Sequence, residues 1–284
     1  MAAAVSSIAV VIPTVRGRED RLAWCLEGLA AQRRPADEIA VVRERPSPVT
    51  ALIDGWRLTS SECVAFLDDD AVPDRTWLER LDSHLADPRV GAVGGRVVHV
   101  VDGRCTAGSY DHGPVAALSW YGRTMSRLGD IPTRRIVCEA SFLPGSNMCV
   151  RREALGEIDP GLAVGMAPGF ELAICQRLHR SGFAVRFDSE IVVTHHPAPR
   201  PSAVERNDAV RYAREYSRVM TYGLLRELSW PRKLAFAAYF GLVGQRHSPG
   251  LALAPACLRG ESRRRLAAAW QGKWEGARAC VSRS

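Results

Sequence analysis

The chain has little lysine, no closely spaced cysteine pair and no long apolar run. Its 38 basic residues include two lysines, Lys233 and Lys273, an arginine bias typical of a high-GC genome. The eight cysteines form no CxxC pair, which argues against a zinc site and predicts a reducing, cytoplasmic location. No stretch of 18 apolar residues predicts a spanning helix. The first residues, MAAAVSSIAVVIP, lack a basic region, so we expect no signal peptide.

Charge is unevenly distributed along a chain of otherwise ordinary composition. Of its residues, 46% are hydrophobic and 24% charged, which is typical of a folded domain with a full core. The net charge is +7, yet residues 198–284 hold 16 basic and 6 acidic residues. This basic segment predicts either an anionic partner, such as a membrane surface or nucleic acid, or a solvated helical face.

Short β-branched apolar runs alternate with segments of helical periodicity. This alternation predicts an α/β fold with a mostly parallel, Rossmann-like central sheet covered by helices on both faces. Gly94 and Gly95 predict a close backbone approach in one strand. Residues 102–140 fit neither pattern, and no internal repeat is found. Strands are predicted at 6–14, 38–44, 62–70, 90–101 and, as two short pieces, 184–197; residues 145–155 are predicted as a strand leading to a short helix. Helices are also predicted at 18–32, 49–60, 77–85, 170–182 and across 203–245.

Three consecutive carboxylates, Asp68, Asp69 and Asp70, directly follow the apolar run VAFL. In a parallel sheet, ligands collect at the carboxyl ends of the strands, where this triplet is expected. The triplet is either a solvated loop or a site for a cation such as Mg²⁺ or Mn²⁺, which takes carboxylate and phosphate oxygens.

Four segments in collinear order resemble glycosyltransferase family 2, whose members have the GT-A fold. They are IAVVIPTVRGREDRLAWCLEGLAAQ, ECVAFLDDDAVPDRTWLERL, LPGSNMCVRREALGEI and FELAICQRLHRSGFAVRFDSEIVVTHHP. Together they cover residues 7–197. The resemblance implies an enzyme that binds a nucleoside-diphosphate sugar through a divalent cation, Mn²⁺ or Mg²⁺.

The same resemblance implies roles for individual donor-site and metal-site residues. Asp68, with Asp69 beside it, would contact the donor nucleoside, and Asp70 would bind the metal. His195 or His196 would complete the metal site, although a histidine pair that simply closes a strand is the alternative. The residues expected to border the nucleotide after the first strand are Pro13, Thr14 and Arg16.

A further match places the catalytic base at Glu171, where the family usually has aspartate. Phe170 occupies the position of the family's preceding acidic residue. The alternative is a first-turn glutamate favoured by the helix dipole. The resemblance therefore implies inverting transfer of a sugar to an acceptor hydroxyl, with Glu171 as the general base.

One departure leaves the nucleobase unassigned, and two other functions stay open. The family's Asp-rich turn after the second strand is replaced by VVRERPSPVTAL. A sugar-phosphate nucleotidylyltransferase would share the fold but needs a Gly-rich, Lys-containing loop, and PTVRGRED has no lysine. A non-catalytic GT-A-like module that binds membranes or anions is the other alternative.

The chain is predicted to contain a catalytic domain, residues 1–200, and a basic, aromatic-rich helical extension, residues 201–284. Within the extension, residues 230–245 combine Trp230, Arg232 and Lys233 with an apolar stretch too short to span a bilayer. They predict peripheral contact with the inner face of a membrane; packing of this stretch onto the catalytic body is the alternative. No nucleic-acid partner is expected.

Overall fold

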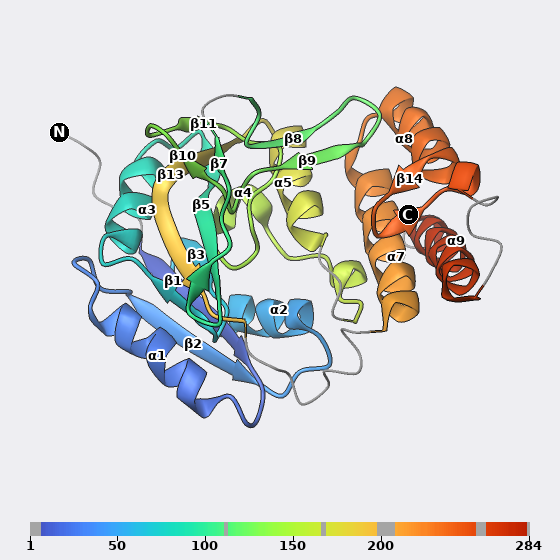
Figure 1. Cartoon of the computed structure of the whole chain (residues 1–284). Helices are drawn as coiled ribbons and strands as arrows, with labels where there is room; N and C mark the ends of the chain where they lie inside the picture. The colour runs from blue at the N-terminus through green and yellow to red at the C-terminus, as the bar shows by residue number, and fades with distance from the viewer. Residues whose placement is uncertain (1–6, 111–112, 166–168, 198–207, 254–259, 283–284) are drawn as a thin grey trace.

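The computed structural model describes residues 7–110, 113–165, 169–197, 208–253 and 260–282 (Figure 1). Its central sheet contains β1 (Ile8–Thr14), β2 (Glu38–Arg43), β3 (Cys63–Phe66), β4 (Ala71–Pro73), β5 (Val90–Val101), β6 (Arg104–Cys105), β11 (Val137–Glu139), β12 (Met148–Arg151) and β13 (Ala184–His195). The main order is β11-β13-β5-β12-β3-β1-β2. Strands β2, β1, β3, β5 and β13 point the same way, because β12 is antiparallel to both β3 and β5.

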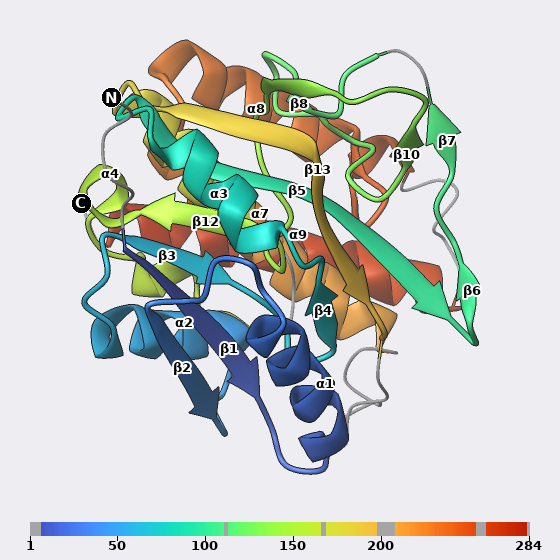
Figure 2. The ribbon, with the colours of Figure 1, turned by 90° about the vertical axis from the view of Figure 1, so that its left-hand side faces the viewer.

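Helices cover both faces of this sheet, which confirms the predicted α/β architecture. Figure 2 shows α1 (Glu19–Ala30) and α3 (Trp77–Leu85) on one face. There Leu22 and Leu81 pack with Val10 and Ile12 of β1. The opposite face is covered by α2 (Pro48–Leu58), α4 (Arg152–Leu155) and α5 (Phe170–Arg180).

Two local sequence signals set the positions of these elements. The side chain of Ser47 caps α2 by accepting a hydrogen bond from the backbone N–H of Thr50 at 3.0 Å, which satisfies a donor of the first turn. A side chain at Gly94 would overlap the carbonyl oxygen of Asn147. The predicted close approach of the backbone at Gly94 is therefore confirmed.

Two segments differ from the predictions. Residues 184–195 form the single strand β13, with a register shift between Phe187 and Val192, and not two short strands. The polar residues at the shift do not end the strand because Asp188 is buried and paired with His84 and Arg135. Residues 102–140 contain short strands besides β6 and β11: β7 (Ser109–Tyr110) pairs with β10 (Ile131–Pro132), and β8 (Ala116–Leu118) pairs with β9 (Thr124–Ser126).

The C-terminal segment is helical and packs on the body through α5. Its helices are α7 (Ala209–Glu227), α8 (Trp230–Leu242) and α9 (Gly260–Val281), with the short strands β14 (Gly244–Gln245) and β15 (Ser248–Pro249) between them. Leu172 of α5 joins Met220 and Leu224 of α7 and Phe236 of α8 in one buried cluster. The predicted boundary near residue 200 and the start of the predicted helical region, residues 203–207, lie outside the described residues. No described helix is both long and apolar enough to cross a membrane.

Candidate active site

The aspartate triplet follows β3 and meets the end of β13. Strand β4 begins directly after the triplet and pairs with β13, so that Ala71 lies opposite His195. As a result, His195 Nε2 lies 2.8 Å from Asp70 Oδ1 and 3.6 Å from Asp68 Oδ2. One ligand atom each from Asp68, Asp70 and His195 lies within 4.8 Å of the other two. Two carboxylates and an imidazole are a suitable set of ligands for a divalent cation.

The two histidines at the end of β13 have different surroundings. The His195 ring joins the carboxylates, and its Nδ1 lies 3.1 Å from Nδ1 of His99 on β5. Burial lowers the pKa of His99, so this ring is neutral at neutral pH and can fix the orientation of His195. By contrast, the His196 ring packs against Trp24 with 6.1 Å between the ring centroids. The structure therefore brings His195 to the carboxylate cluster, while His196 donates its backbone N–H to the carbonyl oxygen of Asp70.

A buried arginine, Arg18, compensates the charge of the triplet. Its guanidinium lies 3.0 Å from Asp69 Oδ1 and also pairs with Asp70 Oδ2. Asp69 further accepts a hydrogen bond from Thr14 Oγ1 at 2.6 Å. Burial raises the pKa of Asp69, and the hydrogen bond from Thr14 and the charge of Arg18 oppose that rise. Arg18 was not among the predicted site residues, although its place between the first strand and the first helix puts it at the same sheet edge as the triplet.

The residues predicted to border the nucleotide have different surroundings in the structure. Pro13 and Asp68 line a cavity. Thr14 and Asp69 are buried and hydrogen-bonded to each other, so they fix the loop after β3 against the end of β1. Arg16 is exposed, and its backbone N–H donates to Glu44 Oε1 at 2.5 Å.

A cavity of about 570 Å³ connects the triplet to the first turn of α5. Asp68, His99 and His195 line one part of it, and Glu171 also lines it. This volume is within the range of small-molecule sites. Tyr212 of α7 and Gly165 complete the lining toward the C-terminal helices. Asp68 and Glu171, which are 103 residues apart in the sequence, thus face one cavity.

Glu171 occupies the first turn of α5. The backbone N–H of Gly169 donates to Glu171 Oε2 at 2.7 Å. Burial raises the pKa of the Glu171 carboxyl, and the backbone hydrogen bonds counteract part of this rise. A raised pKa makes a carboxylate a stronger base at neutral pH.

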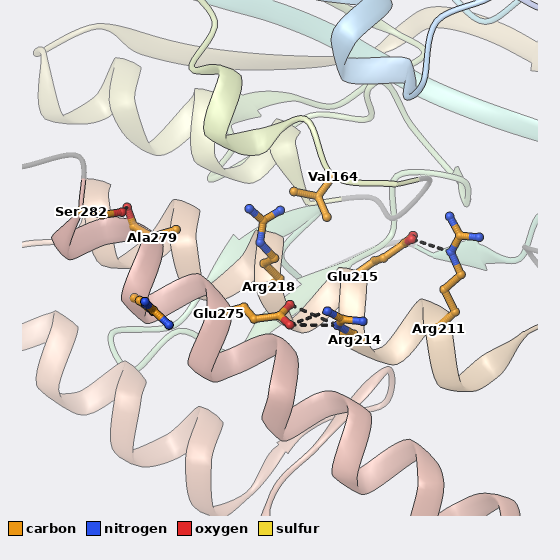
Figure 3. A pocket seen from close by; sticks show the side chains of 9 residues that line it. Val164, Arg211, Arg214, Glu215, Arg218, Glu275, Ala279 and Ser282 are labelled. Carbon is orange, nitrogen blue, oxygen red and sulfur yellow. Dashed lines mark hydrogen bonds and ion pairs between the residues drawn. The ribbon is translucent and has the colours of Figure 1, made fainter.

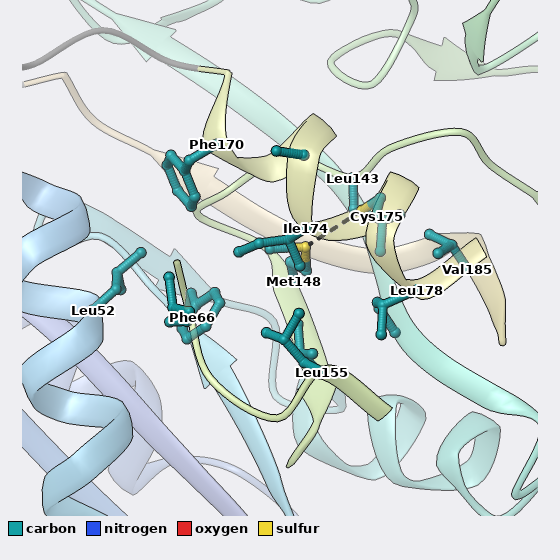
Figure 4. Close-up of a cluster of buried hydrophobic side chains, with 14 of the residues drawn as sticks. Leu52, Phe66, Leu143, Met148, Leu155, Phe170, Ile174, Cys175, Leu178 and Val185 are labelled. Carbon is teal, nitrogen blue, oxygen red and sulfur yellow. Dashed lines mark hydrogen bonds between the residues drawn. The ribbon is translucent and has the colours of Figure 1, made fainter. Parts of the chain in front are cut away.

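The core beneath α5 fixes the position of Glu171. Figure 4 shows Phe170, Ile174 and Cys175 of α5 directed toward side chains of the sheet. Cys175 Sγ lies 3.8 Å from Met148 Sδ of β12. Because these side chains are close-packed, the helix holds the carboxylate on a rigid element.

The fold and the site together define a GT-A-type protein with an acidic, cation-suited cluster at the strand ends. The family model described as glycosyl transferase family 2 matches residues 42–159. This match covers less than half of the chain, and curated relatives and structural neighbours of the chain are also glycosyltransferases by name or title.

Two curated relatives have the same general class in their names. Over 148 residues the chain is 28% identical to the pre-mycofactocin glycosyltransferase of Mycobacterium tuberculosis. The aligned region covers 52% of this chain and 30% of that protein. Over 162 residues it is 24% identical to the glycosyltransferase AglE of Haloferax volcanii. This aligned region covers 57% of this chain and 48% of that protein. The matched region thus spans half or less of these relatives.

Solved structures of low sequence identity share the fold. GalNAc-T7, crystallised with UDP, GalNAc and Mn²⁺, has a TM-score of 0.61 at 14% identity, over 83% of this chain and 50% of that one. TarS of S. aureus, in complex with UDP-GlcNAc, has a TM-score of 0.59 at 13% identity, over 96% and 83%. The mannosyltransferase PcManGT of Pyrobaculum calidifontis, with GDP-Man and Mn²⁺, has a TM-score of 0.54 at 16% identity, over 99% and 86%.

Proposed function

We propose that this chain is a metal-dependent, inverting glycosyltransferase that moves a sugar from a nucleoside diphosphate to an acceptor hydroxyl. The observation that supports this proposal most is one cavity lined both by members of the Asp68, Asp70 and His195 cluster and by Glu171. The fold neighbours crystallised with UDP, GalNAc and Mn²⁺ and with GDP-Man and Mn²⁺ agree with it.

The proposed mechanism divides the work between the two ends of the cavity. Asp68, Asp70 and His195 would hold Mn²⁺ or Mg²⁺, and the bound ion would neutralise the departing diphosphate. Arg18 and His99 orient Asp70 and His195 through direct contacts. Glu171 removes the proton from the acceptor hydroxyl, whose oxygen attacks the anomeric carbon on the face opposite the diphosphate. The bond from that carbon to the diphosphate oxygen breaks as the new glycosidic bond forms.

The donor site is tested by calorimetry of nucleoside diphosphates and their sugars, with and without Mn²⁺. We expect donor binding that depends on Mn²⁺. Asp70→Asn should lower donor affinity by about tenfold or more, because even the loss of a residue that only hydrogen-bonds to a metal ligand lowers metal affinity by about that factor. Asp20→Asn, at an exposed aspartate of α1, is the matched control. Binding that is equally strong in EDTA, or unchanged in Asp70→Asn, contradicts the proposed metal site.

The proposal extends to peripheral contact with the cytoplasmic face of a membrane through residues 230–245. The apolar side chains of α8 point two ways: Phe236 and Phe240 are buried, whereas Trp230 and Leu234 are 70% and 56% exposed. Packing accounts for the first pair and leaves the second pair available to an interface.

Vesicle co-sedimentation tests this contact. The full chain should pellet with vesicles that contain phosphatidylglycerol, and Leu234→Glu should weaken pelleting. Leu58→Glu, at a 70% exposed leucine of α2, should not. If the full chain stays in the supernatant, the packing of α8 onto the body is its whole role.

A further inference from the structure

A second cavity, of about 720 Å³, lies between α7 and α9 (Figure 3). Residues 211, 214, 215 and 218 line it from α7, and this spacing places them on one helix face. Val164, from the segment before α5, also borders the cavity. Its charged lining residues are Arg211, Arg214, Glu215, Arg218, Glu275 and Arg278.

Two glycines of α9 bring these side chains together. A side chain at Gly272 would overlap the carbonyl oxygen of Arg214, and one at Gly276 would crowd that of Arg218. The separation of two packed helices depends on the residues at the contact, and glycines permit the closest approach. The charged residues of α7 and α9 near these contacts therefore line the same cavity.

Positive charge exceeds negative charge in this cavity. Arg211 Nε lies 2.8 Å from Glu215 Oε1, and Arg214 Nη2 lies 2.5 Å from Glu275 Oε1. Among the described residues, no hydrogen bond or ion pair joins an acidic side chain to Arg218 or Arg278; the charge of Arg218 contributes at longer range to the lowered pKa of Glu275. Figure 3 shows the Arg218 guanidinium extending toward Val164, away from the Arg214–Glu275 pair. Two guanidinium groups are thus available to an anion.

This arginine cavity adjoins the candidate active site. Val164 lines the arginine cavity and Gly165 lines the cavity of Glu171. On α7, Arg211 lines the former and Tyr212 the latter. The carboxylate of Glu215 lies against Gly165, where it would overlap an added side chain. One extended molecule could therefore reach from Glu171 along α7 to Arg218.

We infer that the arginine cavity binds a phosphate group of the acceptor, with Arg218 and Arg278 on the phosphate oxygens and the acceptor hydroxyl at Glu171. The inference rests on the proposed function, because it assigns the acceptor of that reaction. Guanidinium groups bind phosphate through paired, charge-assisted hydrogen bonds. The donor diphosphate belongs to the carboxylate cluster, which needs a cation to receive it, whereas the arginine cavity needs none.

Titration calorimetry of the full chain with inorganic pyrophosphate in EDTA tests the inference. We expect binding without any divalent cation and a loss of about tenfold or more in affinity for Arg218→Gln/Arg278→Gln. The control, Arg263→Gln/Arg264→Gln, removes the same charge from exposed positions of α9 that do not line the cavity. It should stay within about twofold of the original affinity, as expected for surface charges.

Co-sedimentation identifies the source of the phosphate. Leu234→Glu is added to both double variants to weaken the proposed membrane contact of α8. If the acceptor phosphate belongs to a lipid, phosphatidic acid in phosphatidylcholine vesicles should then pellet the control variant but not Arg218→Gln/Arg278→Gln. Equal pelleting of the two variants, together with the expected calorimetry, assigns a water-soluble phosphorylated acceptor.

Two results overturn the inference: no pyrophosphate binding by the unmodified chain, or equal weakening in both double variants. Mn²⁺-dependent donor binding, measured on the same preparations, is expected to be unchanged in both. If donor binding persists but pyrophosphate does not bind, only the inference about the arginine cavity is wrong. Its absence from the unmodified chain removes the proposed function.

Discussion

The two carboxylate-bearing ends of the candidate active site differ in how their charge is compensated. At the end of β3, Asp69 and Asp70 are buried against the Arg18 guanidinium, and His195 lies beside Asp70. At the start of α5, Glu171 accepts the backbone N–H of Gly169, and within the described residues no basic side chain pairs with it.

This difference suits two different tasks. Fixed positive partners hold carboxylates ionised and in place, which a cation site requires. The same partners would weaken a general base, because an adjacent positive charge lowers the affinity of a carboxylate for a proton. Burial raises the pKa of both Asp69 and Glu171. At Asp69 the Thr14 hydrogen bond and the Arg18 charge oppose this rise, whereas at Glu171 only backbone hydrogen bonds oppose it.

The comparison is tested most strongly by Glu171→Gln. Glutamine keeps the size of the side chain but cannot take a proton from the acceptor, so turnover should fall by about 10²- to 10⁴-fold. Donor affinity should persist, since the cation cluster lies on other elements. Turnover and donor affinity are measured on one preparation of the variant.

Glu153→Gln, at an exposed glutamate of α4, is the control and should keep full activity. Near-normal turnover of Glu171→Gln would place the base elsewhere. Lost donor affinity would make Glu171 a donor-binding residue and erase the contrast between the two ends.

The opposite end is tested by Arg18→Gln. Removing the partner of two buried carboxylates should cost about 3–5 kcal/mol of unfolding free energy, as for other broken buried ion pairs. Urea unfolding measures the loss, and Mn²⁺ should recover part of it by supplying positive charge to Asp70. Arg33→Gln, at an exposed position, should cost little. If Arg18→Gln unfolds like the unmodified chain, the triplet does not need this compensation.

The smallest effect concerns the pH dependence of stability. The folded-state pKa of Glu171 is raised above its ordinary value of 4.5. The folded state therefore binds this proton more tightly than the unfolded state, and its contribution to stability is present at low pH and lost as the pH rises through the folded pKa. Glu171→Gln should accordingly be more stable than the unmodified chain at pH 7, and the gap should close below about pH 4.5. Thermal unfolding across pH 4–8 measures this gap; a constant gap would contradict the raised pKa.

The sequence predicted those parts of the molecule that depend on local patterns. The apolar strands at 6–14 and 62–70 and the glycines of 90–101 identified the sheet, its helical layers and the location of the triplet. Helix 170–182 was visible from its apolar spacing and its terminal glycine. Local periodicity and turn residues carry this information in neighbouring positions.

Long-range partners were not predictable in the same way. The Arg18 ion pairs join residues more than 50 positions apart. No local sequence pattern around either partner predicts the pairing. Residues 184–197 were predicted as two short strands, whereas the buried Asp188 within β13 is compensated by His84 and Arg135 from distant elements. Charge compensation of buried groups depends on tertiary packing, which a single sequence does not display.

The pairing of β4 with β13 has a thermodynamic consequence. It joins Asp68 and Asp70 to His195, so the ligand set is complete only when the last strand of the sheet has docked. A cation that binds all three ligands would bind the folded chain in preference to any form with β13 detached. Metal occupancy and the closure of the sheet are then linked equilibria, and the concentration of the free ion would set how often this edge of the molecule opens.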